Sequence, residues 1–292
     1  MNHHWGNCAD VIKHVFLTEW LPGVMVDFEL YIETHAGSAI YDAHSDNRTE
    51  SQCGYIELLN ACRLGKLDND ITQSRYVREL LQLNANFYPS EAPFYLGSPG
   101  WEMLLHPQGV NPSLHFFDTD TTSVHNIDKF ARKSKLHDKV VVSVEDGIVG
   151  ADLLIENKAD HDRICIFLDP FVHDCNTANA IERWSKAGCT VLFWYPLYGN
   201  EKPASPAAPE VLMGQLTDPR CKRWEAVWNT STKCGSEGGN LIGAGMAWFG
   251  KSDNPRNRPT TILSLLAEWL TNLSEPYRNV ECVPAHLSEG GN

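Results

Sequence analysis

The sequence has no apolar run of 18 residues and comparatively few basic side chains. Its 292 residues include 37 acidic but only 24 basic side chains, so the formal net charge is −13. The amino terminus, MNHHWGNCAD, has neither the basic start nor the apolar stretch of a secretion signal. A membrane-spanning helix needs about 20 apolar residues, so that class of protein is excluded. We therefore expect a soluble, cytoplasmic protein built around one large domain.

Paired cysteines and metal-binding motifs are also missing. The nine cysteines are odd in number, no two of them form a CxxC pair, and no His–Cys cluster has zinc spacing. Cys165 and Cys189 lie inside apolar, strand-like runs. We therefore expect reduced thiols and no metal site.

The common signatures of phosphate and dinucleotide ligands are absent as well. No GxxxxGK[ST] loop occurs, and no GxGxxG follows the first predicted strand. A protein that binds RNA through its phosphates needs a concentrated positive surface. The one local basic stretch, DKFARKSKLHDK (128–139), is more typical of the solvated face of a helix. Nucleic acid is therefore a disfavoured partner, although a local basic face would still permit it.

Helical and strand patterns alternate along the chain. Helical spacing occurs at residues 7–21, 54–65, 74–84, 98–106, 124–135, 176–188 and 261–273. Apolar strand patterns occur at residues 26–33, 113–118, 139–146, 163–169, 189–196, 223–229 and 245–250. This alternation predicts an α/β fold whose mostly parallel sheet is covered by helices on both faces, with the last two strands forming a pair.

Four of the predicted strands end in acids, namely Glu33, Asp118, Asp146 and Asp169. Ligands of open α/β sheets bind beyond the carboxyl ends of the strands. Asp118 is placed to accept both hydroxyls of a ribose, and Asp146-Gly147 to meet an adenine edge. Any one of these acids is more typical of a turn or a helix cap. Together they favour an adenosine-containing ligand.

Short motifs spread over nearly the whole chain resemble those of RlmJ-like proteins, and they occur in the same order. RlmJ-like proteins are bacterial 23S rRNA adenine-N6 methyltransferases that use S-adenosylmethionine. The matching stretches are GN-ADV-KH (6–14), Y-ETHAG (31–37), GSP (97–99), DG (146–147), FLDP (167–170), WYP (194–196) and GM (245–246).

The resemblance implies a Rossmann-like class I methyltransferase sheet, mostly parallel with an antiparallel last strand. It also implies a small helical insertion after the first strand. The expected division is a cofactor-binding domain at 1–46 and 98–292 and an inserted helical subdomain at 47–97. By position, the residues that would bind S-adenosylmethionine are Lys13, His14, His35, Gly37, Ser98, Asp118, Asp146, Gly147 and Asp169. A histidine standing alone is more typical of a core or capping residue, but the motif context favours a ligand role for both His14 and His35.

The sequence departs from the family at the catalytic motif. Family members that methylate adenine carry Asp-Pro-Pro-Tyr after the fourth strand, where the acid and a proline carbonyl orient the exocyclic amine and the aromatic stacks on the base. This chain has Asp169-Pro170-Phe171-Val172-His173 instead. Phe171 could replace the missing aromatic, His173 could serve a different acceptor, or the site could have lost methyl transfer.

We therefore interpret Asp169, Pro170, Phe171 and His173 as the candidate catalytic residues. The first hypothesis is an S-adenosylmethionine-dependent methyltransferase acting on a small-molecule or other non-rRNA acceptor. Three alternatives stay open. They are an rRNA or other nucleic-acid adenine-N6 methyltransferase, an enzyme that releases methylthioadenosine from the cofactor, and a non-catalytic cofactor-binding protein.

Overall fold

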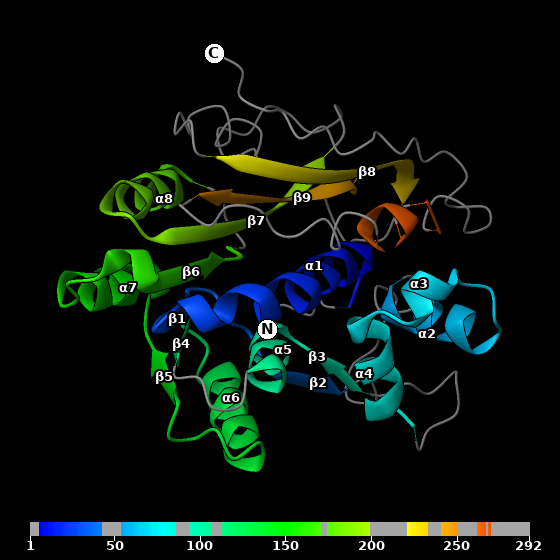
Figure 1. Ribbon diagram of the computed structural model, residues 1–292, viewed down its shortest axis with the longest axis horizontal. Helices are drawn as coiled ribbons and strands as arrows, with labels where there is room; N and C mark the ends of the chain where they lie inside the picture. Colours follow the sequence, from blue (N-terminus) through cyan, green and yellow to red (C-terminus); the bar gives the residue numbers. More distant parts are fainter. Residues whose placement is uncertain are drawn as a thin grey trace.

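A seven-stranded sheet forms the centre of the molecule (Figure 1). The computed structural model describes residues 6–42, 54–85, 94–106, 112–170, 174–198, 221–232, 241–249, 262–266 and 268–269. The strand order is β5-β4-β1-β6-β7-β9-β8. The strands are β1 (Leu30–Glu33), β4 (Ser113–Asp118), β5 (Val140–Val144), β6 (Ile164–Leu168), β7 (Thr190–Tyr198), β8 (Lys222–Thr232) and β9 (Leu241–Phe249).

Five neighbouring strands, β5 to β7 in spatial order, pair in parallel, whereas β9 is antiparallel to both β7 and β8. The mostly parallel sheet with an antiparallel last strand is therefore confirmed. β4 and β5 lie on one side of β1, and β6 and β7 lie on the other. The strand order thus reverses between β1 and β6, and an open α/β sheet forms its ligand crevice at such a point.

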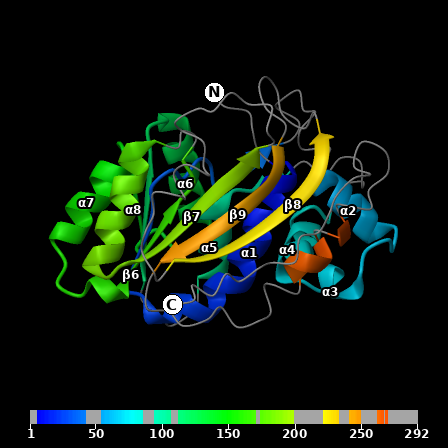
Figure 2. The ribbon, with the colours of Figure 1, turned by 90° about the horizontal axis from the view of Figure 1, so that it is seen from above.

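Helices cover both faces of the sheet because its strands are apolar on both sides (Figure 2). On β1, Tyr31 packs into the same core as α1 (Cys8–Val24), α5 (Ser98–Leu105) and α6 (Thr121–Lys133). Its neighbours Leu30 and Ile32 point the other way, toward α7 (Gly147–Glu156) and α8 (Cys175–Ala187). The helical residues 262–266 and 268–269 pack on the α1 side.

The helices that follow the first strand lie between two short strands. β2 (Ile40–Asp42) and β3 (Phe94–Leu96) pair antiparallel, with Ile40 opposite Leu96. Between them come α2 (Tyr55–Arg63), α3 (Asn69–Thr72) and α4 (Arg75–Leu83). The ring of Tyr76 in α4 lies 5.0 Å from that of Trp101 in α5, so these helices share one core with the sheet. The division at residues 47 and 97 remains a prediction.

Most predicted elements are observed, with differences at the first strand, at α3, at the β2–β3 ladder and at α7. The strand predicted at 26–33 is observed only over β1, because Met25–Asp27 forms a 3-10 helix. The β2–β3 ladder was not predicted, because each strand has only three residues. Helix α7 was not predicted either; its sequence GIVGADLLIE is rich in glycine and β-branched residues, which have low helix propensity. A further 3-10 helix spans His161–Arg163. No helix within the described ranges is both long and apolar enough to cross a membrane.

Candidate functional site

The loop that follows β1, residues 34–39, lies across the carboxyl ends of the central strands. The Thr34 amide donates to Phe167 O of β6 at 3.1 Å, and the Ala36 amide donates to Phe117 O of β4 at 3.0 Å. The loop is thereby attached to strands on both sides of β1, at the point where the strand order reverses.

Glycines allow the neighbouring backbone to approach this loop closely. A Cβ atom added at Gly147 would lie 1.9 Å from Thr34 O, and one added at Gly97 would lie 2.1 Å from Ser38 O. A Cβ at Gly100 would lie 2.1 Å from Ala39 O. These approaches leave no room for any side chain. Backbone contacts at Gly97, Gly100 and Gly147 therefore enclose the loop on two sides. We call these three glycines the glycine clamp.

Within the loop, Gly37 takes a backbone conformation that disfavours other residues. Its φ is +63°, and its amide donates to Asp118 Oδ2 at 2.8 Å. The second carboxylate oxygen of Asp118 accepts from the Asp120 amide at 2.8 Å. Each carboxylate oxygen has two lone pairs, so Asp118 retains the capacity to accept further donors.

Lys13 on α1 lies between two carboxylates. Its Nζ is 2.5 Å from Asp169 Oδ2 and 2.9 Å from Asp10 Oδ1, and the lysine side chain is only 8% exposed. Burial by itself lowers the pKa of Lys13, but the charges of Asp10 and Asp169 outweigh it and raise that pKa above its ordinary value. Burial also raises the pKa of Asp10, and Lys13 opposes this only in part. The ammonium group therefore stays charged and fixes the direction of the Asp169 carboxylate.

His14, next on the same helix, is buried with one ring nitrogen unsatisfied. Its Nδ1 lies 2.5 Å from the Tyr95 hydroxyl, whereas Nε2 has no hydrogen-bond partner among the described residues. Burial, aided by the nearby Lys13 charge, lowers the pKa of His14 well below its usual value. The ring is therefore neutral near pH 7, and a buried ring nitrogen without a partner is costly unless a ligand satisfies it.

His35 lies in the loop itself, half-buried among acids. Its Nδ1 is 2.8 Å from Thr34 Oγ1. Burial lowers the pKa of His35, although the carboxylates of Asp118, Asp146 and Asp169 act in the opposite direction. The imidazole is thus close in space to three of the acids that end the central strands.

Ser98 and Asp146 each begin a helix beside the loop. Ser98 Oγ donates to Glu33 Oε1 at 2.5 Å. Asp146 Oδ1 accepts from the amides of Ile148 and Val149 at 2.9 and 3.2 Å, so Asp146 is the N-cap of α7. The capping role that its sequence context allows is therefore observed, and its carboxylate lies at the edge of the site.

The structure brings most of the candidate residues together at the carboxyl edge of the sheet. These are Lys13, His14, His35, Gly37, Ser98, Asp118, Asp146, Gly147 and Asp169. Pro170, which follows Asp169, is buried. Phe171 and His173 lie outside the described residues. Which of these side chains contact a ligand therefore remains a prediction.

Sequence reasoning missed three polar partners in this region. Asp10 could have been found from its i,i+3 spacing to Lys13, which places both on one face of α1. Tyr95 and Glu102 flank the GSP stretch, but their contacts with His14 and Tyr31 join residues far apart in sequence. No local pattern predicts such contacts.

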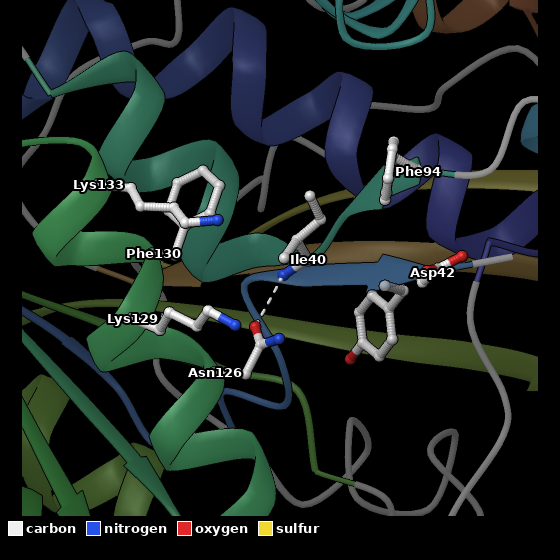
Figure 3. A pocket seen from close by; sticks show the side chains of 8 residues that line it. Ile40, Asp42, Phe94, Asn126, Lys129, Phe130 and Lys133 are labelled. Atoms are coloured by element: carbon white, nitrogen blue, oxygen red, sulfur yellow. Dashed lines mark hydrogen bonds between the residues drawn. The ribbon is translucent and has the colours of Figure 1, made fainter. Parts of the chain in front are cut away.

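A separate groove of about 270 Å³ lies between α6 and the β2–β3 ladder (Figure 3). It is lined by Ile40, Tyr41, Asp42, Phe94, Asn126, Lys129, Phe130 and Lys133. Asn126 Oδ1 accepts from the Ile40 amide at 3.1 Å across its inner side. None of the candidate cofactor residues lines this groove, so we place the site at the strand ends, where the charged and unsatisfied groups converge.

Comparison with known proteins supports the architecture. No protein-family model and no curated protein matches the chain. A Legionella pneumophila protein of the family model DUF519 has 23% identity, with 95% of this chain and 96% of that chain covered and a TM-score of 0.71. The strand order and this end-to-end structural match identify the fold. The chain has the class I methyltransferase fold.

Two other solved structures resemble only part of this methyltransferase fold. An O-methyltransferase from Bacillus cereus in complex with SAH is 13% identical over 66% of this chain and 90% of that chain, with a TM-score of 0.33. A SAM-dependent O-methyltransferase from Thermotoga maritima is 14% identical over 53% of this chain and 57% of that chain, with a TM-score of 0.32. These TM-scores are too low to carry an argument about the ligand of this chain.

The chemistry of the site suits a cationic ligand better than a metal ion. Around the loop, the carboxylates of Asp118, Asp146 and Asp169 lie close to His35, and Lys13 is the cation that pairs with Asp169. No group of three or more His, Cys, Asp and Glu side chains in the described part of the chain is arranged to hold a metal. Acids in excess over cations favour a positively charged organic ligand.

Proposed function

We propose that the protein is an S-adenosylmethionine-dependent methyltransferase, similar to RlmJ-like proteins, that acts on a small-molecule or other non-rRNA acceptor. The class I methyltransferase fold is compatible with this activity, and the DUF519 family model of the Legionella relative corresponds to RlmJ-like proteins. The preference for a non-rRNA acceptor rests on the departure from Asp-Pro-Pro-Tyr after Asp169 and on the net charge of −13.

One observation carries the proposal, namely the group formed by Lys13, Asp169 and His14 at the carboxyl-terminal ends of the central strands. The Asp169 carboxylate is held by Lys13 at 2.5 Å, and His14 Nε2 is buried without a partner. Both lie at the reversal of strand order, where this fold class binds its ligands. A ligand with a hydrogen-bonding group for Nε2 and a positive centre for the Asp169 carboxylate would satisfy both features.

S-adenosylmethionine, when bound, would supply a methyl group on a positively charged sulfur. Lys13 fixes the direction of the Asp169 carboxylate, so that Asp169 accepts a hydrogen bond from the donor group of the acceptor and orients its lone pair. In-line methyl displacement requires alignment and exclusion of water more than a strong acid or base. Pro170 is buried and contributes to that exclusion. We assign acceptor selection to Phe171 and His173, where this chain departs from the Asp-Pro-Pro-Tyr pattern.

The charge of the chain supports the choice of acceptor. A net charge of −13 opposes the binding of a phosphate backbone. Lys129 and Lys133 on α6 belong to the single basic stretch and line the separate groove rather than the site. We therefore expect a neutral or small acceptor rather than structured rRNA.

The decisive experiment is methyl transfer from S-adenosylmethionine with a labelled methyl group. The protein would be incubated in parallel with a metabolite extract, with total RNA and without any acceptor. We expect label in a small molecule, with S-adenosylhomocysteine as the second product. Asp169→Asn should abolish the transfer, whereas Asp128→Asn, which removes one partner of an exposed ion pair on α6, should not change it.

Each other outcome selects a different function. Robust labelling of purified rRNA would overturn the acceptor assignment in favour of an adenine-N6 methyltransferase. Methylthioadenosine formed without an acceptor would show release chemistry instead of transfer. Calorimetric binding without turnover would show a cofactor-binding protein, and failure to bind S-adenosylmethionine would overturn the whole proposal.

A further inference from the structure

Two glutamates are completely buried side by side beneath the candidate cofactor site. Glu33 ends β1, Glu102 lies in α5, and both are 0% exposed. Ser98 Oγ donates to Glu33 Oε1 at 2.5 Å, and the Tyr31 hydroxyl donates to Glu102 Oε1. The other oxygens, Glu33 Oε2 and Glu102 Oε2, accept no hydrogen bond from any other described group. The two carboxyl groups lie within hydrogen-bonding reach of each other.

Two ionised carboxylates cannot face each other at no cost in a buried site. Burial raises the pKa of both groups well above the ordinary value. The charge of Glu33 raises the pKa of Glu102 further, and the hydrogen bond from Tyr31 opposes this rise. At Glu33 the Ser98 hydrogen bond and the Lys13 ammonium oppose the rise, while Asp169 supports it. Among the described residues, the other titratable groups facing the pair are Tyr31 on β1 and Cys165 on β6, and burial raises the pKa of both.

Ser98 and Tyr31 each donate to one oxygen of the pair, so the two Oε2 atoms need one further proton to form a hydrogen bond. With one proton between Glu33 Oε2 and Glu102 Oε2, every carboxyl oxygen of the pair has a partner. With none, the two oxygens repel each other; with two, the two hydroxyl groups compete for the same space. One proton is the arrangement that leaves no buried polar atom of the pair unsatisfied.

We propose that Glu33 and Glu102 share a single proton, and that Glu102 is a positioning residue that fixes the Ser98 hydroxyl through Glu33. Because Ser98 donates its proton to Glu33, its oxygen can offer only lone pairs to a ligand. That last consequence rests on the proposed function, whereas the shared proton does not.

Glutamine substitutions test the shared proton directly. In Glu102→Gln the new amide NH2 group can donate to Glu33 Oε2 while the amide carbonyl accepts from Tyr31. In Glu33→Gln the amide NH2 group can donate to Glu102 Oε2 while the amide carbonyl accepts from Ser98. In the double variant the two amide carbonyl groups accept from Ser98 and Tyr31, so the two amide NH2 groups face each other and neither finds an acceptor. Near pH 5 we expect each single variant to change the unfolding equilibrium constant by less than about tenfold. The double variant should raise it on the order of 10- to 100-fold beyond the product of the single effects. Additive effects of the two substitutions would overturn the proposal.

The pH dependence of stability gives a second, independent readout. The folded pair retains a proton that unfolded glutamates, with an ordinary pKa of 4.5, release above that pH. Raising the pH therefore favours unfolding of the wild type, by about tenfold in the unfolding constant per pH unit. Glu102→Gln carries no such proton. The ratio of the wild-type to the variant unfolding constant should therefore rise by about tenfold per pH unit between about pH 5 and 7. Parallel profiles would contradict a shared proton.

Glu225→Gln is the matched control for these measurements. Glu225 Oε1 also accepts from a tyrosine hydroxyl, that of Tyr195 at 2.6 Å, as Glu102 Oε1 does from Tyr31. We expect the stability profile of Glu225→Gln to run parallel to that of the wild type. An infrared carbonyl band of a protonated carboxylic acid should be present at neutral pH in the wild type and absent in Glu102→Gln. Its persistence in that variant would overturn the assignment.

The positioning role has its own measurement. Glu102→Ala should raise the KM for S-adenosylmethionine more than it lowers kcat, and Glu102→Gln should restore the KM to within a few-fold of the wild type. An unchanged KM in Glu102→Ala would overturn the positioning role even if methyl transfer is observed. Absence of methyl transfer in the wild type would instead overturn the proposed function and leave the stability and infrared tests of the proton unaffected.

Discussion

At the scale of single residues, the Lys13 ion pairs are the most consequential contacts at the strand ends. Lys13→Met leaves Asp10 and Asp169 without their counterion, at side-chain exposures of only 14% and 25%. We expect the free energy of unfolding to fall by about 3–5 kcal/mol, because unpaired buried charges are costly. Chemical denaturation measures this, and binding of S-adenosylmethionine should be lost as well.

Lys186→Met is the control for that substitution. Lys186 also pairs at 2.5 Å, with Glu182, but these side chains are 70% and 41% exposed. Removal of an exposed pair should cost less than about 1 kcal/mol. Equal losses in the two variants would show that the Lys13 pairs are screened by solvent and do not fix Asp169.

His14 predicts a loss of stability at mildly acidic pH. Its pKa is lowered by burial, so the unfolded chain binds a proton more readily than the folded chain just below pH 6.5. The free energy of unfolding should therefore fall by about 1.4 kcal/mol per pH unit from this group as the pH drops below 6.5. His14→Gln should reduce this slope but not abolish it, because the pKa of His35 is lowered too.

The exposed His125 on α6 provides the comparison for that titration. His125→Gln should leave the acid slope of the wild type unchanged. If His14→Gln also leaves it unchanged, the imidazole of His14 is not buried in its neutral form.

The residue scale also shows how far the sequence could predict the site. The acids Asp118, Asp146 and Asp169 could be placed at the site because parallel strands end at one edge of a sheet. The Tyr31–Glu102 contact could not, because it depends on how α5 packs on β1. The roles of Phe171 and His173 rest on sequence alone.

At the scale of elements, the glycine clamp makes the loop after β1 sensitive to substitution. Gly147→Ala would place a methyl group 1.9 Å from Thr34 O, which requires the backbone to move. We expect a loss of about 1–3 kcal/mol in unfolding free energy, as for other overpacked positions, together with weaker cofactor binding. Denaturant unfolding and calorimetry measure the two effects.

Gly23→Ala in α1 is the matched control, because Gly23 is exposed and has no heavy atom near its absent Cβ. Its free energy of unfolding should stay unchanged or rise by up to about 1 kcal/mol, since alanine favours helix. A loss as large as that of Gly147→Ala would mean that the effect at position 147 does not come from the clamp.

Elements with strong periodicity or long apolar runs were predictable, and short or unusual ones were not. The nine-residue β7 is buried over most of its length and contributes Leu192 and Phe193 to opposite cores, so its apolar run was clear. Helix α7 was not predicted because its glycines and β-branched residues have low helix propensity, although Asp146 was already a candidate helix cap. The cap and the ligand role use the same residue.

At the scale of the whole molecule, the helices between β2 and β3 do not form a separate core. Tyr55 of α2 and Tyr76 and Leu80 of α4 belong to the same buried cluster as α1 and the sheet, and Glu19 of α1 accepts from the Arg75 amide. We therefore expect one cooperative unfolding transition, with equal calorimetric and van't Hoff enthalpies. Two separate heat-absorption peaks would show instead that residues 47–97 unfold as an independent domain.

The overall architecture was predictable from the alternation of elements, and the strand order agrees with it. The acceptor is a property of a few side chains near Asp169 and does not follow from the architecture.

The glycine clamp has a kinetic consequence for ligand capture. Because Gly97, Gly100 and Gly147 hold residues 34–39 against rigid elements before any ligand arrives, association requires no ordering of that loop. Stopped-flow binding of S-adenosylmethionine should then follow a single exponential whose rate rises linearly with ligand concentration. A rate that reaches a plateau would reveal a slow rearrangement before or after encounter, and the clamp would then not be closed in advance.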